Sequence, residues 1–332
     1  MITGKNIINQ LQIIIYLLSL FLISCNQSQP ADNFTYTVSS VDAPPAKSLP
    51  RVVATTSILC SLTQQIAGET INLDCLIPAD KNPRSYQITP TDQQAINQAQ
   101  LVLVHGYNLE PSLIAFMRTQ KQLSPVVAVG EQAQPKPRLL KSGNKSVADP
   151  FIWHDVRNGI KMADIIRNQL QNLAPENANI YRQNHQKLVT ELNQLHNWIQ
   201  SRIASIPAYN RIFISTHPEL GYYANTYGLA SRSYLQPISN KSQISTEQIN
   251  TLAQAIRKTR VPAIFVEAGI NPPVFQAIAQ QSQVRIFTRP LFTYGLGKHG
   301  SQVDTYQRVM THNTRAIVEG LGGTYLMFNV ET

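Results

Sequence analysis

Histidine and acidic side chains are the first candidates for chemistry in this chain, because neutral imidazoles and carboxylates are the ligands that Zn²⁺ takes in proteins. His217 and Glu219 stand two residues apart, directly after an apolar run at 211–215 that is typical of a strand. His154 and Glu267 are further candidates for a metal site. A lone histidine is more often structural than metal-bound, so these residues need a framework that brings them together.

Sequence patterns of common enzymes give no support for catalysis. The chain has no His-Glu-x-x-His zinc motif, no Gly-x-Ser-x-Gly nucleophile turn and no phosphate-binding glycine loop. We therefore expect a binding protein and not an enzyme.

The N-terminus predicts export and a lipid anchor. Residues 1–25 contain one lysine and then an apolar run, which is short for a membrane span and suits a signal peptide. The run ends in Leu22-Ile23-Ser24-Cys25, which resembles a bacterial lipobox, so we predict that Cys25 carries lipid. The polar, proline-containing segment 26–50 is expected to be a flexible tether. The alternative is a short membrane anchor followed by a chance cysteine.

Length, composition and charge indicate a globular protein of two domains. The chain has 332 residues, of which 43% are hydrophobic and 14% charged. Its net charge of +9 falls to +8 when residues 1–24, with their one lysine, are removed. The positive charges are scattered, apart from one run in a polar loop at 132–148 that we expect to be solvated. No nucleic-acid motif accompanies them, so we expect no nucleic-acid partner. The run comprises Lys136, Arg138, Lys141 and Lys145.

Apolar runs alternate with helical patterns along most of the chain, which predicts an α/β protein with mainly parallel sheets. Between the two alternating halves, an apolar stripe at helical spacing predicts one long helix over 175–206. We therefore divide the folded part into an N-terminal lobe at 51–174, a bridging helix at 175–206 and a C-terminal lobe at 207–332. The predicted strands are 52–54, 71–77, 101–104, 125–129, 211–215, 263–267 and 284–287, and helices are predicted from about 57 to 67, from 91, and over 246–258, 273–281 and 304–321.

Two cysteines remain after the predicted processing. Cys60 falls on a predicted helix and Cys75 on the next strand. An extracytoplasmic compartment permits a disulfide between them, and two small buried thiols are the alternative.

An ordered set of short segments over residues 51–330 resembles the substrate-binding proteins of zinc- and manganese-type ABC importers. The resemblance implies two Rossmann-like α/β lobes, joined by a long rigid helix, around one cleft that captures the ion for a permease. Partner permease and ATPase subunits and a monomeric state are implied with it. The segments are Val53-Ala54-Thr55-Thr56-Ser57-Ile58, Gly106-Tyr107-Asn108-Leu109-Glu110, Asp149-Pro150-Phe151-Ile152-Trp153, His217 through Leu229, Phe265-Val266-Glu267, and Thr305-Tyr306 with His312-Asn313.

Four corners of the cleft carry the metal in that family, as His, His, His or Glu, and Asp. Here the corresponding positions hold Arg84, Phe151, His217 and Tyr294, so only His217 keeps a ligand type. A guanidinium cannot ligate a cation, and a phenol must first lose a proton with a pKa near 10. Binding a cation would then recruit other side chains.

Arg84 and His154 each leave two interpretations, whereas Phe151 is expected to pack the floor of the cleft and Tyr294 to donate a hydrogen bond. Arg84 is either an exposed loop arginine or a replacement for the metal that pairs with Glu219 or Glu267. His154 either substitutes for the ligand lost at Phe151, three residues earlier, or is a histidine that lies at the surface or behind the metal ligands. Glu219 can add a carboxylate oxygen beside His217.

Two functions follow from the resemblance and the altered corners. The first is capture of a metal ion, with zinc favoured over manganese because His217 stands at the third corner. The alternative is a degenerate family member, a surface lipoprotein that serves adhesion or partner docking. Both place the protein on the extracytoplasmic side of a bacterial membrane.

Overall fold

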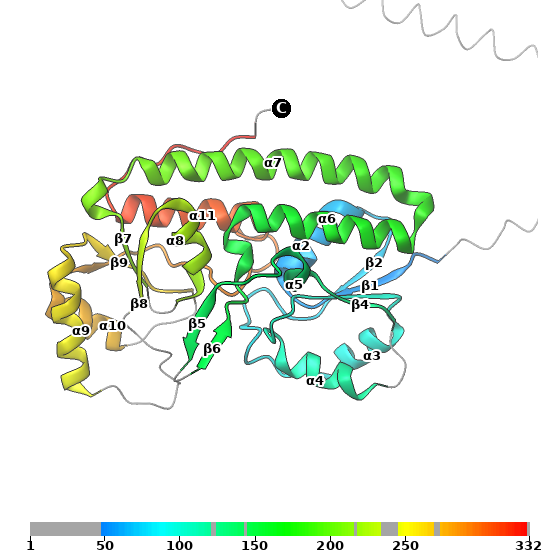
Figure 1. The fold of residues 1–332 in the computed structure, drawn as a ribbon, viewed down its shortest axis with the longest axis horizontal. Coiled ribbons are helices and arrows are strands. Elements are labelled where there is room, and N and C mark those ends of the chain that lie inside the picture. The colour runs from blue at the N-terminus through cyan, green and yellow to red at the C-terminus, as the bar shows by residue number, and fades with distance from the viewer. Residues whose placement is uncertain are drawn as a thin grey trace, which may run out of the picture. The chain divides into compact units, whose positions relative to one another are not determined.

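Short, mainly apolar runs form the central strands of the N-terminal lobe (Figure 1). The computed structural model describes residues 48–120, 124–142, 145–215, 218–233, 245–268 and 273–330. Strands β1 and β3 lie in the middle of a parallel sheet of order β2-β1-β3-β4, which explains why β3 is buried along its whole length. The strands are β1 (Arg51–Ala54), β2 (Asn72–Cys75), β3 (Leu101–Val104) and β4 (Val126–Ala128).

Side-chain caps fix where the helices of this lobe begin. Thr56 caps α2 (Ser57–Ala67) by accepting a hydrogen bond from the backbone N–H of Leu59. Thr89 and Asp92 form a reciprocal capping box at the start of α3 (Pro90–Gln98). Helices α4 (Pro111–Thr119) and α5 (Val129–Ala133) complete the lobe.

The C-terminal lobe repeats the parallel arrangement, with one pair of four-residue strands and one pair of two-residue strands. Strand β7 pairs with β8, and β9 pairs with β10, each in parallel. A parallel bridge between Ser215 and Phe265 joins the two pairs. The elements are β7 (Ile212–Ser215), α8 (Gly221–Tyr227), β8 (Ala230–Ser233), α9 (Thr246–Thr259), β9 (Ala263–Ile264), α10 (Pro273–Ser282), β10 (Arg285–Ile286) and α11 (Tyr306–Gly320).

A long helix that packs against the last helix of the N-terminal lobe connects the two lobes. Helix α6 (Val156–Leu173) is followed by α7 (Ala178–Ala204), whose 27 residues span roughly 40 Å. The predicted apolar stripe of α7 is buried, and the helix packs against α2 and α6 of one lobe and α11 of the other. The predicted fold class, with mainly parallel sheets and a long bridging helix, is confirmed.

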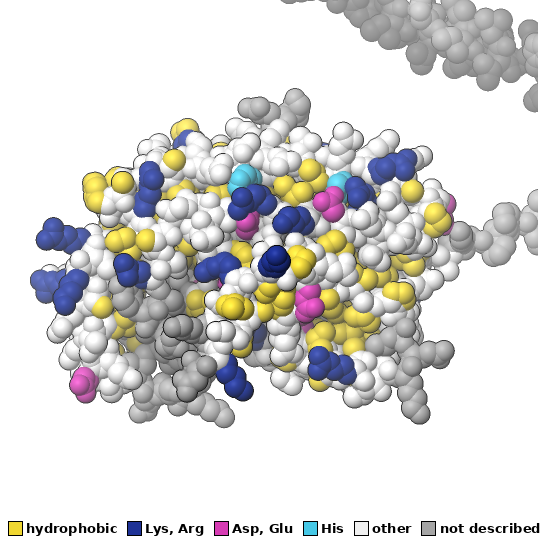
Figure 2. Space-filling view, in the orientation of Figure 1, with side chains coloured by type: hydrophobic (Ala, Val, Ile, Leu, Met, Phe, Trp, Pro, Cys, Tyr) yellow, Lys and Arg dark blue, Asp and Glu magenta, His cyan; other side chains and the backbone are white. Residues whose placement is uncertain are grey.

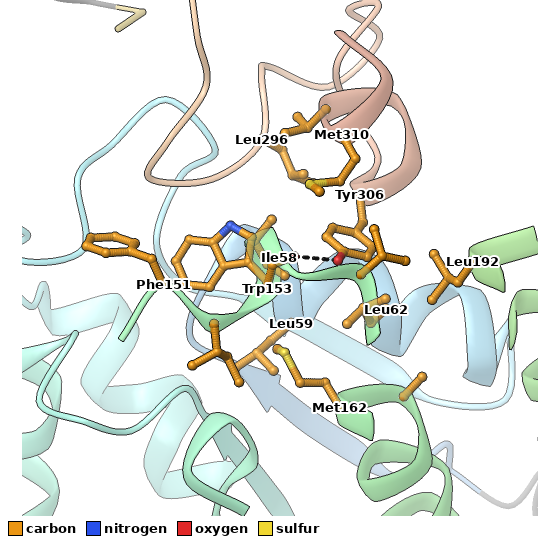
Figure 3. Close-up of a cluster of buried hydrophobic side chains, with 14 of the residues drawn as sticks. Ile58, Leu59, Leu62, Phe151, Trp153, Met162, Leu192, Leu296, Tyr306 and Met310 are labelled. Carbon is orange, nitrogen blue, oxygen red and sulfur yellow. Dashed lines mark hydrogen bonds between the residues drawn. The ribbon is translucent and has the colours of Figure 1, made fainter. Parts of the chain in front are cut away.

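One hydrophobic core runs through the region where the lobes meet (Figure 3). Trp153, in the 3₁₀ turn Ile152–His154, is fully buried beside Ile58 and Leu59 of α2. The hydroxyl of Tyr306, at the start of α11, donates a 2.5 Å hydrogen bond to the carbonyl oxygen of Trp153. This contact joins the first turn of α11 in the C-terminal lobe to the segment that carries Phe151.

The disulfide that the sequence left open is present. Cys60 in α2 is bonded to Cys75 in β2, with their Cα atoms 5.7 Å apart. The bond therefore fastens the edge strand of the sheet to the helix that covers it.

The prediction that residues 132–148 form a polar loop is wrong in one respect. The segment contains an antiparallel hairpin of β5 (Leu139–Ser142) and β6 (Lys145–Ala148). Its strands are short, and each has two adjacent apolar and two adjacent polar residues, so their sequence shows no alternation. The run of positive charge is also only partly solvated, since Lys136 and Lys145 are exposed and Arg138 is half-buried.

Elsewhere on the face seen in Figure 2, lysine and arginine side chains are scattered, as expected. None of the helices in the described ranges has the length and apolar character of a membrane span.

Candidate functional site

Arg84 extends from a loop between β2 and α3. The side-chain oxygen of Asn82 accepts a 3.0 Å hydrogen bond from the Arg84 N–H, which turns the chain at this point. The guanidinium Nη1 of Arg84 lies 3.5 Å from Oε1 of Glu219, which belongs to the C-terminal lobe. Its Cζ lies 4.6 Å from the ring centre of Phe151. The ion pair predicted between Arg84 and Glu219 is therefore present, with an aromatic face against the cation.

Phe151 is held by the turn that follows the hairpin. The carboxylate of Asp149 accepts a 3.0 Å hydrogen bond from the Phe151 N–H, and the ring is fully buried. Its neighbours are Trp153 at 5.3 Å and Tyr294 at 5.9 Å between ring centres, both edge-on (Figure 3 shows Phe151 beside Trp153). Phe151 thus packs against aromatic rings from both lobes and brings no ligand atom.

Tyr294 approaches the same point from the C-terminal lobe. Its hydroxyl is hydrogen-bonded to Glu219. Burial, followed by the negative charges of Glu219 and Glu267, raises the pKa of Tyr294 far above its ordinary value of 10. The phenol is therefore neutral at physiological pH, so it donates a hydrogen bond and does not act as an anionic ligand.

The two acidic candidates are both buried. Glu219 lies in the 3₁₀ turn Pro218–Leu220, and only 2% of its side chain is exposed. Glu267 follows β9, where it forms a parallel bridge with Leu291, and it is equally inaccessible to solvent. Both carboxylates act electrostatically on Tyr294, so both lie in its neighbourhood.

His154 is buried beside this group and faces the backbone. Its Nε2 lies 3.0 Å from the carbonyl oxygen of Thr293, so this nitrogen donates and Nδ1 keeps its lone pair. Burial lowers the pKa of His154 to about 4, so the ring is neutral. Its ring packs against Trp153 at 5.2 Å.

Two predicted site residues, His217 and Cys25, lie outside the described residues. Within the described ranges, no group of three or more His, Cys, Asp or Glu side chains is arranged to hold a metal ion. What the structure does bring together is a set of four side chains, here named the corner cluster. It consists of Arg84, Phe151, Glu219 and Tyr294.

A second charged pair beside the corner cluster was missed from the sequence. Asp149 is fully buried, and its Oδ2 lies 3.6 Å from Nη1 of Arg138. Burial raises the pKa of Asp149 to about 6, against the opposing effects of Arg138 and Arg84. The Arg138 N–H also donates a 2.7 Å hydrogen bond to the hydroxyl of Tyr222 in α8, so the hairpin is held to the C-terminal lobe. Only the adjacency of Asp149 to Phe151 hinted at this pair.

Comparisons with known proteins agree with the fold and the order of the segments. The family described as "Zinc-uptake complex component A periplasmic" matches residues 52–320. FimA of Streptococcus parasanguinis, a metal ABC transporter substrate-binding lipoprotein, is 31% identical over 278 residues, which are 82% of this chain and 89% of that protein. PsaA of Streptococcus mitis, a manganese ABC transporter substrate-binding lipoprotein, is 28% identical over 282 residues, with the same coverage.

A solved structure shows the same architecture. The periplasmic zinc-binding protein TroA from Treponema pallidum superposes with a TM-score of 0.75 at 27% identity, covering 82% of this chain and 99% of that one. The family match extends over both lobes and the bridging helix, and it includes the three described corner positions. The chain therefore belongs to the family of periplasmic zinc-uptake component A proteins.

Proposed function

We propose that this protein is the extracytoplasmic solute-binding lipoprotein of a metal-ion ABC importer. Lipid on Cys25 anchors it at the membrane, and residues 26–50 are the tether. It captures the ion between lobes 51–174 and 207–332, which the segment 175–206 bridges, and delivers it to a permease that works with an ATPase. It acts as a monomer and catalyses no reaction.

The observation that carries this proposal is the convergence of the corner cluster. Arg84 is separated from Glu219 by 135 positions in the chain, yet the two side chains meet between the lobes. Glu219 and Glu267 are buried carboxylates at this point, and a cation is the ligand that offsets such buried negative charge. The relatives FimA and PsaA, both named as substrate-binding lipoproteins of metal ABC transporters, support the same assignment.

Zinc is the proposed cargo in preference to manganese. The third corner is His217, and a neutral imidazole suits zinc, whereas manganese takes a larger share of oxygen ligands. His154, Glu219 and Glu267 are the side chains that we propose to complete the shell around His217. The neutral ring of His154 and the buried Glu219 support this choice.

Uptake of radioactive zinc and manganese by the encoding bacterium tests the proposal. Deleting the gene should slow zinc uptake, and the wild-type gene should restore it. Glu219→Gln should not restore it, because the amide lacks the negative charge that attracts the ion. Glu247→Gln is the matched control, because Glu247 is an exposed residue in the first turn of α9. Unchanged zinc and manganese uptake after deletion would contradict the proposal and favour the docking lipoprotein.

A further inference from the structure

The guanidinium of Arg84 lies at a half-open position beside acidic and aromatic side chains. It contacts Glu219 at 3.5 Å and rests on the ring of Phe151 at 4.6 Å. Its charge also acts on Asp149 and Tyr294, lowering the pKa of both groups against the stronger effect of burial. The positive charge of Arg84 therefore acts on several buried polar side chains at the point where the lobes meet.

The two partners of this ion pair differ in their access to water. The side chain of Arg84 is 40% exposed, whereas that of Glu219 is 2% exposed. The guanidinium can therefore move into solvent at small cost, while the carboxylate would stay buried and need another cation. The recorded contact involves one nitrogen and one oxygen at 3.5 Å, which is looser than a two-pronged arginine–carboxylate pair. These features indicate that another cation can replace the guanidinium of Arg84 as the partner of Glu219.

We propose that Arg84 is a tethered cation that competes with the metal cargo for Glu219, and that this competition sets the affinity of the protein for its ion. The inference rests on the proposed function. Without cargo, the guanidinium offsets the charge of Glu219 from the opposite lobe. Cargo binding displaces the guanidinium into solvent. The free energy needed to break the ion pair therefore lowers the affinity for the cargo. Arg84 is then an affinity-determining residue and not a ligand.

Zinc titration of the full-length protein in detergent tests the competition, with a chromophoric chelator as competitor. Arg84→Gln and Arg84→Met remove the charge and keep much of the side-chain length, whereas Arg84→Lys keeps the charge. Arg118→Gln is the matched control, because it removes the same charge from an exposed position on α4. Thermal unfolding of each variant verifies that it is folded.

The two neutral variants should bind zinc about tenfold more tightly than the wild type, because zinc no longer has to break a charge-assisted contact of Glu219. Arg84→Lys and Arg118→Gln should stay close to the wild-type Kd. Equal zinc affinity in the wild type and both neutral variants would overturn the inference and leave the proposed function intact. Equal tightening by Arg84→Lys would also overturn it, because the positive charge would not be the cause. Absence of zinc and manganese binding in every folded variant would overturn the proposed function itself, and the inference with it.

Discussion

Replacing Cys60 and Cys75 together with alanine should lower the free energy of unfolding by about 3 kcal/mol, the entropy cost of closing a loop of this size in the unfolded chain. The loop is set by the 15-residue separation of the two cysteines. Cys75 is exposed and Cys60 only half-buried, so the lost sulfur atoms contribute little packing. The effect arises mainly in the unfolded chain, which gains freedom between α2 and the edge strand β2.

Urea unfolding followed by circular dichroism measures this loss. With a slope of about 3 kcal/mol per M, the midpoint should fall by about 1 M urea. Reducing the wild type should give the same midpoint as the double variant, and reductant should not change the variant. A loss below about 1 kcal/mol would refute the loop-entropy reasoning, because the cross-link would then constrain little of the unfolded chain.

Three further predictions concern the buried carboxyl group of Glu110, the close contact of Gly130 with the backbone of His105, and the corner cluster. Burial raises the pKa of Glu110 from 4.5 to about 7, so the folded protein holds a proton that the unfolded chain has lost between these values. Stability should therefore fall as pH rises through this window, and Glu110→Gln should flatten the decline in urea unfolding; an unchanged slope would contradict this. Gly130→Ala should destabilise by about 1–3 kcal/mol in the same assay, because its Cβ would lie 2.6 Å from the carbonyl oxygen of His105, and a loss near zero would show that the backbone yields. Replacing Arg84 and Phe151 together by histidine should tighten zinc binding in chelator competition beyond the effect of Arg84→Gln, since two imidazoles are added, and equal affinities would contradict it.

Much of the fold could be predicted from local patterns. Apolar runs marked β1 and β3, and the predicted starts of the helices at 57 and 246 agree with α2 and α9, which Thr56 and Ser245 cap. The strand predicted at 263–267 is β9 only as far as Ile264, and its pairing continues as single bridges at Phe265 and Glu267, a change of partner that no local pattern encodes. The hairpin of β5 and β6 was missed because its apolar and polar residues do not alternate, and it is held by contacts such as that of Arg138 with Tyr222.

The corner cluster was only partly predictable. Charge complementarity suggested the pair of Arg84 with Glu219, and the resemblance placed Phe151 and Tyr294 nearby. The stacking of the guanidinium on Phe151 and the hydrogen bond from Tyr294 depend on side-chain directions across two lobes, which no local pattern encodes. The charge pair of Asp149 escaped prediction for the same reason.

Metal content measured on the full-length protein tests the central claim most directly. The protein in detergent is loaded with zinc and with manganese in turn, dialysed exhaustively and subjected to elemental analysis. The proposed function predicts about one zinc ion retained per chain, with manganese retained less, as expected for a single site that includes His217. A folded protein that retains neither ion would contradict capture of a metal cargo.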